Sequence, residues 1–142
     1  MGKTPYAYTK HETIVYDVKA GSKGTVLLVD DSKMSRNMLR NLLEEAGYSI
    51  LAEATNGAEA VEAYKKQEPD LVTLDITMPV MDGIEALKKL LEYDPDVKAI
   101  MITAAGQQSK LIEALKIGAK KFITKPFEKD EIVSNVAEVM NE

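Results

Sequence analysis

The sequence has no cysteine, no tryptophan and one histidine in 142 residues. Without cysteine the chain can form neither a disulfide nor a thiolate metal site, as is usual in a reducing compartment, and we expect a cytoplasmic location. Apolar runs are short, and none reaches the roughly 20 residues of a transmembrane helix. The N-terminal residues lack the apolar stretch of a signal peptide. We therefore expect no membrane partner.

Positive charge is scarce as well. The chain carries 18 lysines and arginines against 23 aspartates and glutamates, which gives a formal net charge of −5. Nucleic-acid binding needs clustered lysine and arginine to neutralise phosphates, and the sequence has no such cluster, so we expect no nucleic-acid partner. The length and a hydrophobic content of 45% fit one packed domain.

The first 24 residues differ from the rest of the chain. They hold three of the six tyrosines, the single histidine and a Gly-Ser-Lys-Gly stretch at 21–24 that is typical of a flexible linker. The alternating pattern of residues 13–18 is compatible with a short strand. We predict an N-terminal extension and linker over residues 1–24 and one domain over residues 25–142.

From residue 25 onward, apolar runs alternate with segments of helical periodicity. The runs that predict strands are 25–29, 48–53, 71–75, 97–103 and 120–124. A helix is predicted after each strand, and the first has an apolar face of Met38, Leu39, Leu42, Leu43 and Ala46. Five strand–helix units in strict alternation predict an α/β fold, with a parallel sheet and helices on both faces.

Polar side chains follow four of the five predicted strands, at the edge where open α/β sheets bind ligands. They are Asp30 and Asp31 after the first strand, Asp75 at the end of the third, Thr103 at the end of the fourth and Lys125 after the fifth. Taken singly, each is more simply a turn, cap or surface residue. Two carboxylates about 4 Å apart repel by about 4 kcal/mol at an effective dielectric constant of about 20, so three together need raised pKa values or a cation.

This combination of residue types favours phosphoryl chemistry. Oxygen ligands without histidine or cysteine suit Mg²⁺, which takes one or two carboxylates together with a phosphate. A lysine and a threonine at the same edge would contact phosphoryl oxygens, and an aspartate can become an acyl phosphate. Asp75 is the candidate phosphoacceptor, with Lys125 and Thr103 as candidate catalytic groups.

Residues from about Thr25 to Glu142 resemble the receiver domain of two-component response regulators. The matching positions are the acid pair Asp30 and Asp31, the acceptor Asp75, the loop residues Met78, Pro79, Asp82 and Gly83, the hydroxyl residue Thr103, and Lys125 with Pro126. The resemblance implies a flavodoxin-like, doubly wound sheet of five parallel strands in the order 2-1-3-4-5 with five helices, and a cis bond before Pro126.

The resemblance also implies a ligand set and a phosphodonor. Mg²⁺ would be held by Asp31, Asp75 and the backbone carbonyl of Thr77, with Asp30 acting largely through water. The donor would be a phosphohistidine on a sensor histidine kinase. Thr103 and Phe122 would form the switch pair that responds to the phosphoryl group.

Three positions depart from common family patterns. Phe122 stands where many members have tyrosine, so the hydroxyl of the switch aromatic is absent. Thr77 and Ala105 lie two residues after Asp75 and Thr103, at positions that tune dephosphorylation in the family. The sequence therefore leaves the lifetime of the phosphoryl group open.

The leading prediction is a single-domain response regulator. Phosphorylation of Asp75 would bias the surface formed by the fourth helix, fifth strand and fifth helix towards a protein partner. The resemblance favours chemotaxis, with the flagellar motor switch as the target, and leaves a phosphatase open as a further partner. We expect a monomer that accepts and loses its phosphoryl group by self-catalysis, rather than an enzyme acting on a separate substrate.

Four alternatives remain at this stage. A phosphorelay intermediate is the nearest. A haloacid-dehalogenase-like phosphatase needs a second aspartate two residues after the nucleophile, where this chain has Thr77. A flavodoxin-like FMN carrier needs a glycine- and hydroxyl-rich loop where this chain has Asp30 and Asp31. A pseudo-receiver scaffold would lack a site residue, and none of the family's site residues is missing.

Overall fold

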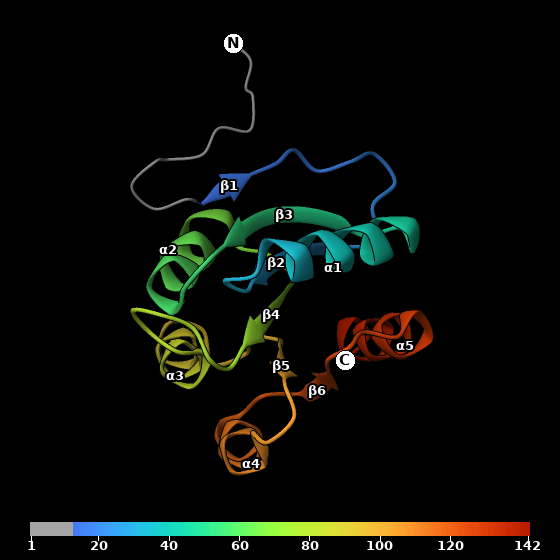
Figure 1. The fold of residues 1–142 in the computed structure, drawn as a ribbon. Coiled ribbons are helices and arrows are strands. Elements are labelled where there is room, and N and C mark those ends of the chain that lie inside the picture. The colour runs from blue at the N-terminus through green and yellow to red at the C-terminus, as the bar shows by residue number, and fades with distance from the viewer. Residues whose placement is uncertain (1–12) are drawn as a thin grey trace.

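The computed structural model describes residues 13–142. The first half of the predicted extension, residues 1–12, therefore lies outside the described residues. A six-stranded sheet is flanked by five helices (Figure 1). The strands are β1 (Ile14–Val15), β2 (Thr25–Val29), β3 (Ser49–Ala54), β4 (Leu71–Asp75), β5 (Ala99–Thr103) and β6 (Lys121–Thr124). The helices are α1 (Lys33–Glu45), α2 (Gly57–Gln67), α3 (Gly83–Tyr93), α4 (Gln108–Ile117) and α5 (Lys129–Met140).

The order of the sheet is β1-β3-β2-β4-β5-β6. The five strands predicted from the sequence pair in parallel, in the predicted order, which confirms the flavodoxin-like fold. In β4 and β5 every residue is buried, as expected for central parallel strands covered by helices on both faces. The domain boundary at residue 24 stays a prediction. None of the helices in residues 13–142 is long and apolar enough to cross a membrane.

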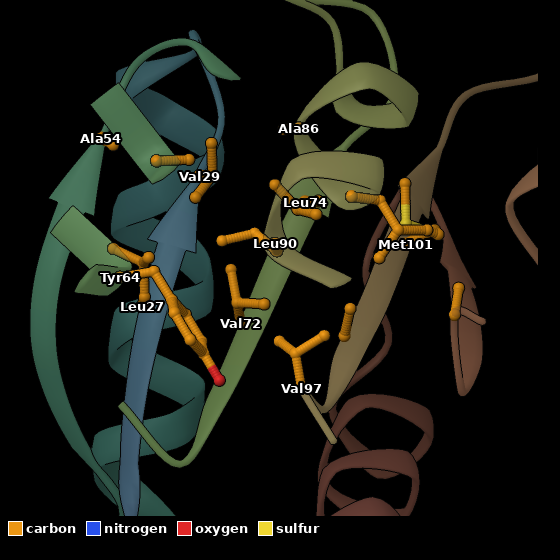
Figure 2. Close-up of a cluster of buried hydrophobic side chains, with 14 of the residues drawn as sticks. Leu27, Val29, Ala54, Tyr64, Val72, Leu74, Ala86, Leu90, Val97 and Met101 are labelled. Carbon is orange, nitrogen blue, oxygen red and sulfur yellow. The ribbon is translucent and has the colours of Figure 1, made fainter. Parts of the chain in front are cut away.

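The sheet separates two apolar cores. Leu27 and Val29 point into a core beneath α2 and α3, whereas Val26 and Leu28 point into a core beneath α1 and α5. This alternation along β2 follows from the two-residue period of a strand. Figure 2 shows the first core, which includes Leu74, Leu90 and Met101. Apolar packing on both faces holds the strands in place, so polar groups can be accommodated at the strand ends.

Helix α1 differs from its prediction. Met38 was expected to face the core, but it is 43% exposed. Arg36 is buried instead, because its Nε donates to Glu53 Oε1 (2.8 Å) and its Nη1 donates to the Asp30 carbonyl (2.6 Å). A buried arginine is tolerated when its charge and its donors are both satisfied.

The N-terminal segment covers the free edge of β3. Strand β1 pairs antiparallel with β3, with Ile14 opposite Glu53. The Tyr16 hydroxyl donates to Glu53 Oε2 (2.9 Å), and the Arg40 guanidinium lies 4.2 Å from the centre of the Tyr16 ring. The strand at 48–53 was expected at the edge of the sheet, but β1 occupies that place and shields its backbone groups.

Candidate functional site

Three carboxylates meet at the carboxyl end of the sheet. Asp30 and Asp31 directly follow β2, and Asp75 is the last residue of β4. Because β2 and β4 are adjacent and parallel, with Val29 paired to Leu74, their ends lie together. One carboxylate oxygen from each aspartate lies within 4.8 Å of the others. Asp30 and Asp75 are buried and Asp31 is exposed, so the cluster is open on one side.

The backbone around Asp30 fixes its carboxylate. Asp30 Oδ1 accepts from the Ser32 amide (2.8 Å). Asp30 Oδ2 has no hydrogen-bond partner among the described residues, although Lys125 Nζ lies 3.1 Å away as an ion-pair partner. The charge of this buried oxygen is therefore compensated by Lys125, while its capacity to accept a hydrogen bond is left for a further ligand.

Lys125 is the positive charge that the described residues bring to these acids. Its Nζ lies 3.7 Å from Asp75 Oδ2 as well as 3.1 Å from Asp30 Oδ2. Burial raises the pKa of the Asp75 carboxyl to about 7, and the charges of Asp30 and Asp31 add to the rise while Lys125 opposes it. One lysine does not compensate three ionised carboxylates, so the site favours a further cation.

The donor set fits a hard divalent cation. The three acids offer only oxygen, they lie close enough to share one ion, and Lys125 is the one cation paired with them among the described residues. These features suit Mg²⁺. When bound, Mg²⁺ would supply positive charge next to the oxygens of a phosphoryl group. Thr77 lies in the loop after β4, two residues beyond Asp75, and the ligand role of its carbonyl stays a prediction.

The loop after β4 packs tightly against Asp75. Gly83 begins α3 and its amide donates to the Ile76 carbonyl (2.8 Å). A Cβ atom on residue 83 would collide with the Asp75 carbonyl oxygen. Glycine is therefore required for this close approach, which holds α3 against the end of β4.

The remaining predicted residues lie on β5 and β6. Thr103 ends β5 and is buried, one residue beyond the Asp75 partner Ile102. The Lys125–Pro126 bond has the predicted cis conformation. Phe122 lies on β6 and is 42% exposed, so its ring is at the surface. The structure thus gathers Asp30, Asp31, Asp75 and Lys125, and the switch roles of Thr103 and Phe122 stay predictions.

Two residues near the site were missed in the sequence. Arg36 supports Asp30 from within α1, and its spacing from Leu39 and Leu43 on one helix face was an available signal. Gln107 accepts from the Ala104 amide (2.7 Å) and donates to Thr77 Oγ1, so its side chain spans the loops after β4 and β5. Its only sequence signal is a glutamine at a helix start, where serine, threonine, aspartate or asparagine is preferred.

We expect the raised pKa of Asp75 to appear in the stability of the metal-free protein. The Asp75 pKa is about 7 in the folded protein and near 3.8 in the unfolded chain. Between these pH values the folded protein therefore holds a proton that the unfolded chain has released. The unfolding free energy of the wild type, measured relative to that of Asp75→Asn, should therefore fall as the pH rises from about 4 to about 7, and should stay level above pH 7. After allowance for solvent screening at the open edge, we expect a difference of about 1–2 kcal/mol.

Urea unfolding of both proteins in EDTA across this pH range measures the effect. Comparison with Asp75→Asn cancels the other titrating groups. A difference in unfolding free energy that does not change between pH 4 and pH 7 would contradict the assignment of the raised pKa to Asp75.

Comparisons with known proteins agree with this geometry. The family model described as the response regulator receiver domain matches residues 26–137. The chemotaxis protein CheY of Thermotoga maritima is 51% identical over 114 residues, which are 80% of this chain and 95% of that protein. CheY of Bacillus subtilis is 48% identical over 116 residues, 82% of this chain and 97% of that protein. The crystal structure of the CheX–CheY–BeF3–Mg²⁺ complex from Borrelia burgdorferi aligns with a TM-score of 0.80 and 40% identity, and covers 84% of this chain and 90% of that one.

Proposed function

Because the chain belongs to the response regulator receiver family and is closely related to CheY, we propose that it is a single-domain response regulator switched by phosphorylation of Asp75. The observation that carries the proposal is the position of Asp75. Its buried carboxylate ends β4 beside Asp30, with Lys125 Nζ 3.7 Å from Oδ2. A carboxylate at the open end of the sheet, beside a lysine and two further acids, is placed where a nucleophile for phosphoryl transfer is needed.

The proposed reaction moves a phosphoryl group from a phosphohistidine of a sensor kinase to Asp75. An Asp75 oxygen attacks phosphorus, the new O–P bond forms, the N–P bond breaks, and the leaving imidazole takes a proton from solvent. In this proposal Lys125 stabilises the negative charge on the phosphoryl oxygens, and the Thr103 hydroxyl contacts one of them. Positioning and charge compensation supply most of the catalysis in such transfers.

The product remains attached to the protein, so we propose a phosphoacceptor switch and not an enzyme that turns over a separate substrate. Loss of the phosphoryl group by hydrolysis returns the switch to its initial state. A cytoplasmic location follows from this proposal, because the kinase that makes the phosphohistidine uses intracellular ATP. A phosphatase partner would shorten the lifetime of the signal.

The output surface in this proposal is the face of α4, β6 and α5. Large apolar side chains are exposed there: Ile112 is 53% exposed, Leu115 37% and Phe122 42%. Exposed large apolar side chains on these elements support a protein contact. The chemotaxis relatives support a role in chemotaxis, with the flagellar motor switch as the proposed target.

Intact mass spectrometry after incubation with acetyl phosphate tests the proposal. We expect a gain of one phosphoryl group that depends on Mg²⁺ and disappears in excess EDTA, because the acids alone repel the incoming anion. Beryllofluoride with Mg²⁺ is a second probe that needs no phosphodonor. If the protein neither gains a phosphoryl group nor binds beryllofluoride, it is not a phosphorylated switch.

A further inference from the structure

The hydrogen-bond ladder between β4 and β5 stops beside Asp75. Asp75 pairs with Ile102, and the Ile76 amide donates to the Ile102 carbonyl (3.2 Å). In a regular parallel ladder the Ala104 amide would next donate to the Ile76 carbonyl. That carbonyl accepts from Gly83 instead, at 2.8 Å. The Ala104 N–H is therefore released from the sheet at the end that carries the acids.

The side chain of Gln107 satisfies this released amide. Gln107 Oε1 accepts from the Ala104 N–H (2.7 Å), and Nε2 donates to the Thr77 hydroxyl. Gln107 is the cap residue of α4, but its side chain makes no hydrogen bond to the first turn of that helix. Gly106, with φ of +89°, lets the chain fold back so that the half-buried side chain reaches both loops.

We propose that Gln107 is a positioning residue that keeps the Ala104 amide occupied until Asp75 carries a phosphoryl group, and that the phosphoryl oxygen then displaces it. The inference rests on the proposed function of Asp75. A charged phosphoryl oxygen is a stronger acceptor than a neutral amide carbonyl, so the exchange favours the phosphoryl group. The hydrogen bonds of Gln107 must break at each phosphorylation, which lowers the affinity of the site for the anion.

Displacement of Gln107 also connects the site to the proposed output surface. Gln107 directly precedes α4, and its two hydrogen bonds tether the start of that helix to the loops after β4 and β5. When both bonds break, the tether is lost. Phosphorylation of Asp75 would in this way release the start of α4 through one side chain.

The test compares Gln107→Ala with Gln108→Ala. Gln108 is the adjacent residue of the same type, and it is exposed on the first turn of α4. Two quantities are measured in each protein: solvent exchange of the Ala104 amide by NMR without ligand, and the dissociation constant for beryllofluoride at saturating Mg²⁺. In Gln107→Ala we expect faster exchange of the Ala104 amide and about three- to tenfold tighter beryllofluoride binding, because fewer hydrogen bonds must break. Gln108→Ala should match the wild type in both.

A second variant should change the beryllofluoride affinity in the opposite direction. Gln107→Glu keeps an acceptor for the Ala104 amide, strengthens that bond by its charge and repels the anion, so beryllofluoride binding should weaken. If the wild type binds beryllofluoride but Gln107→Ala binds with unchanged or lower affinity, the role of Gln107 is wrong and the proposed function stands. If neither the wild type nor any variant binds beryllofluoride or accepts a phosphoryl group, both proposals are wrong.

Discussion

Replacing Asp75 with asparagine is expected to abolish phosphoryl acceptance while the fold is retained. The asparagine amide has nearly the same shape as the carboxylate but is not a nucleophile, and it cannot form an acyl phosphate. The buried position at the end of β4 has room for the amide, and loss of one of three repelling charges removes a destabilising interaction. Intact mass after treatment with acetyl phosphate and Mg²⁺ should show no phosphoryl group on this variant.

The matched control is Asp96→Asn. Asp96 is exposed and lies before β5, at the opposite end of the strands from the acid cluster. This variant carries the same chemical change but should accept one phosphoryl group as the wild type does. Circular dichroism of both variants should match the wild type. A phosphoryl group that remains on Asp75→Asn would show that another residue is the acceptor.

Replacing Glu53 with alanine is expected to cost about 3–5 kcal/mol of unfolding free energy, the range for breaking a buried ion pair from one side. The Glu53 side chain is 3% exposed, and its Oε1 accepts from Arg36 Nε at 2.8 Å. Its Oε2 accepts from the Tyr16 hydroxyl at 2.9 Å and pairs with Arg40. Without this carboxylate, the buried guanidinium of Arg36 has no counter-charge. Urea unfolding with a two-state fit measures the loss.

Glu138→Ala is the control for this prediction. Glu138 pairs with Lys121 at 2.7 Å, but its side chain is 59% exposed. An exposed pair contributes little, so we expect a change of no more than about 1 kcal/mol. If Glu53→Ala costs as little as Glu138→Ala, then solvent reaches the Arg36 and Arg40 charges. The account of β1 and α1 as joined through one buried carboxylate would then be wrong.

The sheet and its acidic edge were predictable because both follow from local pattern. Buried strands such as 71–75 show as unbroken apolar runs, and polar residues at their ends meet because parallel strands end at one edge. Ser32, Asn56 and Asp82 are residue types preferred at helix starts, and the side chain of each accepts a backbone hydrogen bond from the first turn of its helix. Such features depend on neighbours in sequence.

Other features depend on partners far along the chain. Arg36 is buried in place of Met38 because Glu53 on β3 and the Asp30 carbonyl satisfy it, and periodicity does not contain those contacts. A short strand within residues 13–18 was readable from the alternating pattern, and β1 lies there, but its antiparallel pairing with β3 was not. The bonds of Gln107 to Thr77 and Ala104 form only once two loops are brought together.

The most direct test of the account is to locate the phosphoryl group in the wild-type protein. After reaction with acetyl phosphate and Mg²⁺, reduction with borohydride converts an aspartyl phosphate to homoserine, and peptide mass spectrometry then identifies the residue. We predict conversion at Asp75, with none at Asp30 or Asp31 and none when EDTA replaces Mg²⁺. Conversion at Asp30 or Asp31, or equal conversion with and without Mg²⁺, would contradict the central claim that Asp75 is the acceptor of a metal-dependent switch.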